Sequence, residues 1–176
     1  KDTQAFKIWK EALELEQREG ARSMIAKAPQ KLTWSKDSSF SFLEILSPAE
    51  LKENIKKVND ASLVSRLVFY NDSFLFTGDI SKSVEQKLAD SKIDLEADVL
   101  KISHHGSKSS SINAFLAAAS PELAVIQVGK NRYGHPASEV MERLRGLNIP
   151  LLRTDQNGDI VIRSDGNGFW VTAKNL

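Results

Sequence analysis

The sequence predicts an α/β domain in which helices pack on a sheet. Beyond Asp79, apolar strand-like runs alternate with helical segments of about ten residues, the pattern of such a domain. Two of the runs, residues 99–102 and 123–128, are almost continuously apolar, as central strands are. The 176 residues, 41% of them hydrophobic, suffice for one domain with a core. We therefore treat residues 1–176 as a single domain.

The first part of the chain predicts one helix and several short strands. Phe6, Trp9, Ala12 and Leu13 recur at helical spacing, and this helix should end near Gly20. Strand-like runs follow at 23–26, 31–34 and 40–46, and residues 48–60 form a brief helix or a solvated loop. Residues 62–79 contain two apolar runs around Asn71-Asp72, which predicts a β-hairpin.

The second part predicts alternating elements and a closing hairpin. Helical segments lie at 81–91, 111–120 and 136–147, and strands at 97–103, 122–129 and 149–154. The runs 158–164 and 168–173 flank a turn at residues 165–168, which predicts the hairpin.

Composition excludes several classes of protein and leaves the compartment unassigned. The net charge of +1 gives no sign of a nucleic-acid binder, and no run is long enough for a membrane-spanning helix. The first residues indicate an amphipathic helix rather than a signal peptide. Without cysteine, a metal ion would have to be held by histidine, aspartate or glutamate.

Candidate functional residues follow the predicted strands. Asp79, the pair His104-His105, the loop 130–135 with His135, and Asp155 each come directly after a strand, and these positions include every histidine of the chain. Ligands bind at the carboxyl ends of strands in open α/β sheets. Imidazole and carboxylate are ligands of divalent transition metals, and one carboxylate can bridge two ions. The pattern predicts a metal site at one rim of the sheet.

Each signal also has a structural interpretation. Asp79 could be a turn or helix-capping residue, although Ser81 and Ser83 compete for that role. His135 could simply precede a helix that has Pro136 at its first position. Two bulky imidazoles before Gly106 do little for a turn, however. Because the residues share consecutive strand ends, we favour the functional interpretation.

Four blocks carry a resemblance to a known family. "NDASLVSRLVFYNDSFLFTGD", "ADVLKISHHGSKSSS", "VGKNRYGHP" and "LLRTDQNGDI" resemble, in order and spacing, the metallo-β-lactamase-like domain of the ComEC-type competence (DNA-uptake) family. The resemblance implies an αββα sandwich, here partial, with a mixed sheet and helices packed on it. It further implies a bacterial hydrolase that acts on DNA or another phosphodiester with two divalent ions, Zn or Mn. Such domains are free-standing or attached to a membrane-embedded protein.

The resemblance assigns catalytic roles to Asp79, His104, His105 and His135. Asp79 would be the carboxylate shared by two metal ions, and His135 a further ligand or close neighbour. One histidine of the pair would face the site and the other support it, since neighbours on a strand face opposite ways. We favour His105, so the expected metal ligands are Asp79, His105 and His135.

The resemblance leaves two alternative roles open for other matching residues. Asn59 and Ser62 would lie near the site, or would form a polar turn before a strand. The alternatives of a substrate phosphate contact or a solvated surface group apply to Ser107, Lys108, Lys130 and Arg132. Arg153, Asp155 and Gln156 form a block with a structural role.

One departure from the family limits the prediction. The family's metal site opens with a His-x-His-x-Asp-His segment, but no histidine precedes His104. The chain therefore resembles the C-terminal portion of the family domain. We expect weak or absent metal binding, no turnover in isolation, and apolar sheet surface left uncovered, which favours self-association.

Three functions are compatible with these residues. The first is a metal-dependent nuclease or phosphodiesterase linked to DNA uptake, inactive as this chain alone. The second is a non-catalytic DNA-binding or assembly module, which the balanced charge disfavours. The third is a hydrolase of small esters or lactams, because one metal site can serve many substrates.

Overall fold

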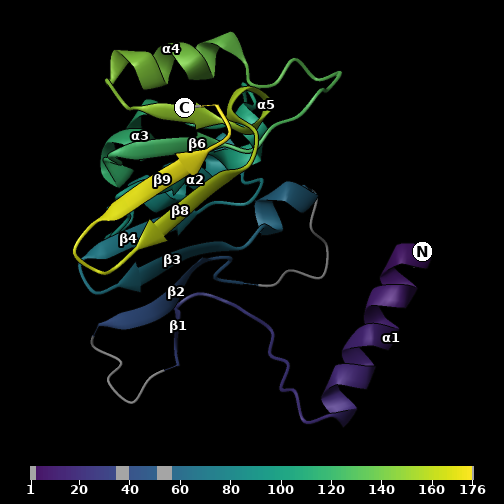
Figure 1. Ribbon diagram of the computed structural model, residues 1–176. Helices are drawn as coiled ribbons and strands as arrows, with labels where there is room; N and C mark the ends of the chain where they lie inside the picture. Colours follow the sequence, from purple (N-terminus) through teal and green to yellow (C-terminus); the bar gives the residue numbers. More distant parts are fainter. Residues whose placement is uncertain (1–2, 35–39, 51–56, 176) are drawn as a thin grey trace.

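A seven-stranded mixed sheet forms the centre of the computed structural model, which describes residues 3–34, 40–50 and 57–175 (Figure 1). The strands follow one another in the sheet in chain order. They are β1 (Gln30–Thr33), β2 (Ser41–Ser47), β3 (Val64–Phe69), β4 (Asp72–Phe76), β5 (Val99–Lys101), β6 (Leu123–Ile126) and β7 (Leu151–Arg153). A second sheet pairs β8 (Ile160–Ser164) with β9 (Phe169–Ala173).

Strand direction changes at β4. The strands β1 to β4 pair antiparallel, and β3 and β4 form the predicted hairpin, whereas β4 to β7 are all parallel. Helices connect the parallel strands: α2 (Lys82–Ala89), α3 (Asn113–Ala119) and α4 (Ser138–Gly146). The predicted α/β class with a mixed sheet is confirmed.

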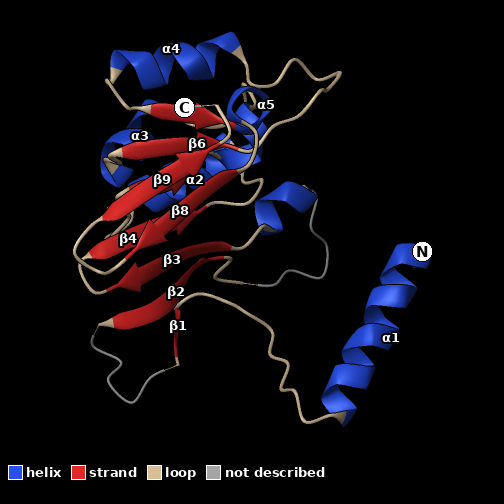
Figure 2. Cartoon of the chain, in the orientation of Figure 1, coloured by secondary structure: helices blue, strands red, loops and turns tan. Residues whose placement is uncertain are grey.

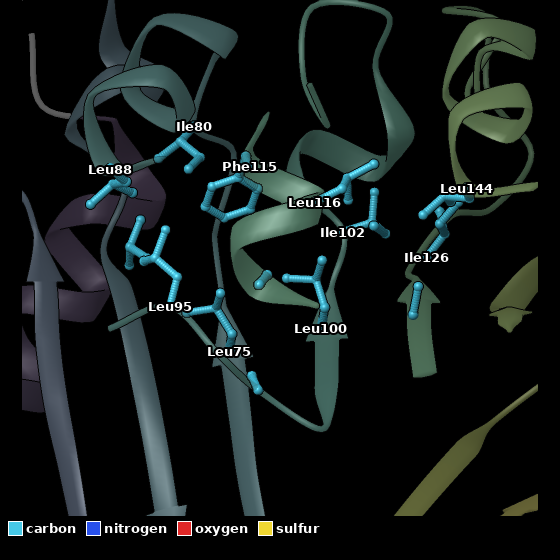
Figure 3. Packing of buried hydrophobic residues seen from close by; sticks show 14 of the residues in the cluster. Leu75, Ile80, Leu88, Leu95, Leu100, Ile102, Phe115, Leu116, Ile126 and Leu144 are labelled. Atoms are coloured by element: carbon cyan, nitrogen blue, oxygen red, sulfur yellow. The ribbon is translucent and has the colours of Figure 1, made fainter. Parts of the chain in front are cut away.

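The three helices lie against the sheet (Figure 2), and the main core lies between the sheet and these helices (Figure 3). Side chains alternate across the sheet, so Leu100 and Ile126 face the helices while Val99 and Val125 face the other way. Phe115, Leu116 and Leu144 supply the helical side of this core and are almost completely buried. The continuous apolar strands are therefore buried on both faces, as predicted.

The other face of the sheet is covered in part by the β8–β9 hairpin. Ile160, Ile162 and Val171 pack against Val99 and Val125. Beside the hairpin an apolar groove of about 460 Å³ lies open, and its lining includes Leu67, Phe69, Phe74, Phe76 and Trp34. Uncovered apolar sheet surface is thus present, while self-association through it stays a prediction.

The helix α1 (Gln4–Arg18) stands apart from the sheet (Figure 1). Thr3 caps it, since its hydroxyl oxygen accepts the backbone N–H of Phe6 at 3.2 Å. Phe6 and Trp9 stack on each other with ring centroids 5.6 Å apart, yet no residue of α1 is buried. None of the helices in the described ranges is long and apolar enough to span a membrane.

Several local predictions were wrong. Residues 23–26 form no strand, and the helix expected from Pro136 begins only at Ser138, in α4. The short helix α5 (Thr154–Asn157) was not predicted. Of the segment 48–60, residues 51–56 lie outside the described residues, and a 3-10 turn, η1 (Val58–Ala61), follows them.

Candidate functional site

The predicted residues meet at the carboxyl edge of the parallel strands. Asp79 follows β4, His104 and His105 lie in the 3-10 turn η2 (Ser103–Gly106) after β5, and His135 ends the loop after β6. The ring centroid of His104 is 6.3 Å from that of His105 and 5.8 Å from that of His135. Since β4, β5 and β6 are parallel neighbours, their ends bring one carboxylate and all three imidazoles together.

Asp79 and His105 make the closest pair. Nε2 of His105 lies 3.6 Å from Oδ1 of Asp79, and both side chains are partly exposed. On the other side of the ring, Nδ1–H of His105 donates to the carbonyl oxygen of Gln127 at 2.7 Å. A carbonyl can only accept, so this bond fixes the tautomer in which neutral His105 turns the lone pair of Nε2 toward Asp79. Two facing acceptors favour a proton or a cation between them.

The turn η2 aims the two histidines in different directions. His104 and His105 both have left-handed backbone conformations, with φ of 49° and 55°, and Gly106 follows with φ of 77°. A Cβ on Gly106 would lie 2.7 Å from Cβ of Pro136, so only glycine lets the turn approach the loop after β6 so closely. His105 faces Asp79, whereas His104 faces Asn59. The two histidines thus point in different directions, as expected. A left-handed turn produces this difference rather than the alternation of side chains along a strand.

Asn59 and Ser62 both lie at the site. Oγ of Ser62 accepts the backbone N–H of Asp79 at 3.1 Å, and Nδ2 of Asn59 lies 3.4 Å from the ring nitrogens of His104. Gly78, with φ of 56°, packs so closely that an added Cβ would lie 2.8 Å from Cβ of Ser62. Asn59 and Ser62 therefore lie near the site, which was the first of their two interpretations. Ser62 positions the backbone that carries Asp79.

His135 is held between two aromatic rings. Tyr133 stacks on it at 5.8 Å between centroids with an interplanar angle of 25°, and His104 meets its ring edge-on. Burial lowers the pKa of His135, and the neighbouring His104 and His105 lower it further because they disfavour another positive charge. Its Nδ1 is buried and has no hydrogen-bond partner within the described part of the chain. This nitrogen is therefore available to a ligand.

Lys101 is a site residue that sequence reasoning missed. Its Nζ donates to the carbonyl oxygens of Gly78 at 3.5 Å and Ile102 at 3.4 Å, which ties the end of β5 to the backbone before Asp79. Burial lowers the pKa of Lys101, and the charge of Asp79 opposes that effect. A lysine inside the otherwise apolar run 99–102 was the signal that could have found it.

The four predicted phosphate contacts separate into two groups. Lys130 and Arg132 are exposed on the loop that carries His135. Ser107 is buried with its hydroxyl 3.0 Å from that of Ser109, and exposed Lys108 lies near Glu139 of α4. Lys130 and Arg132 are therefore better placed beside His135 than Ser107 is, and a phosphate contact stays a prediction for all four.

Residues 153–156, at the end of β7 and in α5, hold the start of the loop that follows β6. Oγ of Thr154 accepts the backbone N–H of Val128 at 2.8 Å and its hydroxyl donates to the carbonyl of Val128, also at 2.8 Å. Arg153 pairs with Asp155 at 2.6 Å, which lowers the pKa of that carboxyl, and Gln156 accepts a bond from the Asn175 amide. These contacts agree with the predicted structural role.

The described residues do not complete a metal centre. Asp79 and His105 are close enough to share an ion, and His135 has an unsatisfied buried nitrogen nearby. However, nowhere in residues 3–34, 40–50 and 57–175 do three histidine, aspartate or glutamate side chains converge as ligands of one ion. A two-metal centre therefore does not fit this set of residues alone.

Comparison with known proteins identifies the family. Residues 55–130, which include Asp79 and the histidine pair, match the model of the metallo-β-lactamase superfamily. These residues belong to the metallo-β-lactamase superfamily. Members of this superfamily usually bind metal ions. Asp79, His104 and His105 lie within the matched residues, whereas His135 lies beyond them.

Relatives of this metallo-β-lactamase-like domain include proteins of bacterial competence. ComE operon protein 3 of Bacillus subtilis is 42% identical over 120 residues, which is 68% of this chain and 15% of that protein. Competence protein ComA of Neisseria gonorrhoeae is 41% identical over 142 residues, 80% of this chain and 19% of that protein. Recombination protein 2 of Haemophilus influenzae is 32% identical over 118 residues, 66% of this chain and 14% of that protein.

The chain thus spans less than a fifth of the length of the relatives it matches. The predicted resemblance to the competence family is confirmed.

Proposed function

We propose that this domain contributes part of the active site of a metal-dependent phosphodiesterase or nuclease linked to DNA uptake. The observation that carries the proposal is the Asp79–His105 pair, in which two acceptors face each other at 3.6 Å. A divalent cation between them would satisfy both, and it would attract the phosphate of a DNA substrate. The competence relatives favour DNA as that substrate.

The chain's own residues have distinct tasks in this proposal. Asp79 and His105 hold the cation, Ser62 and Lys101 fix the backbone that carries Asp79, and His135 offers its buried Nδ1. Lys130 and Arg132 bind the phosphate backbone, which gives affinity without sequence choice. The coordination shell requires further ligands, and we propose that a longer protein containing this chain supplies them.

Hydrolysis of labelled linear DNA in the presence of Mn²⁺ or Zn²⁺ tests the proposal. The assay compares this chain with a longer protein that contains it, each as wild type, Asp79→Asn and His135→Ala. We expect hydrolysis only by the longer wild-type protein, and a loss of at least about 100-fold in both variants. Asp159→Asn changes an exposed carboxylate after α5 and serves as the matched control. Full activity in either site variant would exclude the proposed site.

The incomplete ligand set favours one second candidate, a DNA-binding module without hydrolysis. That function predicts salt-sensitive binding of DNA in the presence of a metal chelator, with unchanged affinity in Asp79→Asn. Absence of binding at low salt would exclude it.

A further inference from the structure

Tyr133 is the most exposed large aromatic side chain among the described residues, yet it lies at the site. Its relative exposure is 82%, and one face of its ring stacks on His135 with centroids 5.8 Å apart. One face of the ring thus contacts the site histidine while its other face is open to solvent. The hollow that it borders, of about 530 Å³, is also lined by His105, Gln127 and Lys130.

The loop that presents Tyr133 is internally braced. Asn131 makes four hydrogen bonds: its Oδ1 accepts the backbone N–H of Tyr133 and of His135, each at 3.0 Å, and its Nδ2 donates to the carbonyls of Gly129 and His135 at 2.9 and 2.8 Å. An aromatic ring on such a loop binds a flat partner with little further loss of conformational entropy.

The charged residues near Tyr133 indicate what kind of partner the ring binds. Lys130 and Arg132 are exposed on the same loop and provide positive charge beside the ring. A ring with one open face, next to cationic side chains that can follow a phosphate backbone, is the arrangement by which proteins bind single-stranded nucleic acid. A purely apolar partner would leave both cations without a counterpart.

We propose that Tyr133 is a stacking platform for an unpaired nucleobase of single-stranded DNA. This inference rests on the proposed function, because it names the form of the substrate that the site would receive. The base stacks on the open face of Tyr133, and the adjoining phosphates lie along Lys130 and Arg132 toward the hollow that contains His105. A base pair inside a duplex has both faces covered by its neighbours, so a duplex without free ends gains nothing from Tyr133.

The test measures binding rather than hydrolysis, with a metal chelator present. Fluorescence anisotropy gives the dissociation constant of a labelled thymidine oligonucleotide of about twelve nucleotides, a length within the site size of known single-strand binders. We expect Tyr133→Ala to weaken binding between about 5- and 150-fold, the range for loss of one base–aromatic stack. Tyr133→Phe keeps the stacking ring and should bind as the wild type does.

Three comparisons separate stacking from other causes. An abasic oligonucleotide with the same sugar–phosphate chain should bind Tyr133→Ala and wild type equally, and so should a covalently closed circular duplex, which has no terminal base pair to stack on the ring. Trp170→Ala removes another exposed aromatic, on β9, and should leave binding unchanged. Equal weakening of the thymidine and abasic oligonucleotides by Tyr133→Ala would overturn the proposal, as would wild-type binding of the thymidine oligonucleotide by Tyr133→Ala.

Failure of this inference can be told apart from failure of the proposed function. If wild type binds the thymidine oligonucleotide but Tyr133→Ala loses nothing, only the stacking role is overturned. If wild type binds no oligonucleotide at low salt, DNA is not the ligand of this chain, and the stacking role is overturned together with the DNA substrate.

Discussion

Nε2 of His105 lies 3.6 Å from Oδ1 of Asp79, although the two residues come from the ends of different strands. The carbonyl of Gln127, at the end of a third strand, accepts the Nδ1 proton of His105. In this tautomer the lone pair of Nε2 points to Asp79. The relationship therefore depends on the parallel register of β4, β5 and β6 and not on one local motif.

The two adjacent histidines should differ in their effect on metal binding. His105 faces Asp79, whereas His104 faces Asn59. We expect His105→Ala to lower the affinity of a longer protein that contains this chain for Mn²⁺ or Zn²⁺ by at least about 100-fold, because the substitution removes a ligand of the ion. His104→Ala should lower it by about 10-fold, as loss of a supporting group does. Titration calorimetry measures both, and equal losses would contradict the assignment of His105 as the ligand.

Gly78 should not tolerate a side chain. It has φ of 56°, and a Cβ there would lie 2.8 Å from Cβ of Ser62 and 3.2 Å from the carbonyl oxygen of Leu63. Gly78→Ala should lower the free energy of unfolding by about 1 to 3 kcal/mol because it strains the backbone next to Asp79. Urea denaturation measures this change.

Gly146→Ala is the matched control for Gly78→Ala. Gly146 ends α4, and no atom lies within 4 Å of the position its Cβ would take. The substitution should leave stability unchanged or raise it by up to about 1 kcal/mol. If both variants unfold at the same urea concentration, the packing of Gly78 against Ser62 has no energetic importance.

The structural role of the block after β7 should come from Thr154 and not from the ion pair beside it. Thr154→Val removes both bonds to the backbone of buried Val128, which should cost about 1 to 2 kcal/mol of unfolding free energy. Asp155→Asn breaks a pair with Arg153 that is partly exposed, which should cost less than about 1 kcal/mol. Thermal denaturation of both variants checks the order, and a larger loss in Asp155→Asn would reverse it.

The sequence predicts the location of the site better than the orientation of its side chains. Alternating strands and helices were enough to bring Asp79, His104, His105 and His135 to one edge, because parallel strands end together. The turn that separates His104 from His105 could not be predicted, since left-handed φ values at two consecutive histidines run against the backbone preference of each. Tyr133 was missed because its role depends on exposure, which an isolated aromatic in a loop does not reveal.

Glu85 was missed for a related reason, since an acidic residue in an amphipathic helix is normally assigned to the exposed face. Its side chain is fully buried beneath the serine-rich loop before α3. The carboxylate accepts the backbone N–H of Ser111 at 2.8 Å and of Ile112 at 3.0 Å. Arg143 of α4 holds the same loop by donating to the carbonyls of Ser110 and Ser111. Glu85 therefore connects α2 to the loop that follows the histidine pair.

Stability should fall with rising pH through the titration of Glu85. Burial raises its pKa above the ordinary value of 4.5, and the bonds from Ile112 and Ser111 oppose this only in part. The folded state consequently binds the proton more tightly than the unfolded state. Its contribution to stability is complete below pH 4.5 and is lost as pH rises through the raised pKa. Urea denaturation at a series of pH values above 4.5 should show this decline.

Substitutions of Glu85 separate its charge from its hydrogen bonds. Glu85→Gln cannot titrate, so its stability should decline less over the same pH range than that of wild type. Glu85→Ala leaves two buried N–H groups without an acceptor and should cost about 2 to 5 kcal/mol. The exposed Glu122→Gln, which lies in the loop before β6, should keep the wild-type slope. A Glu85→Gln variant with the wild-type slope would show that another group is responsible for the pH dependence.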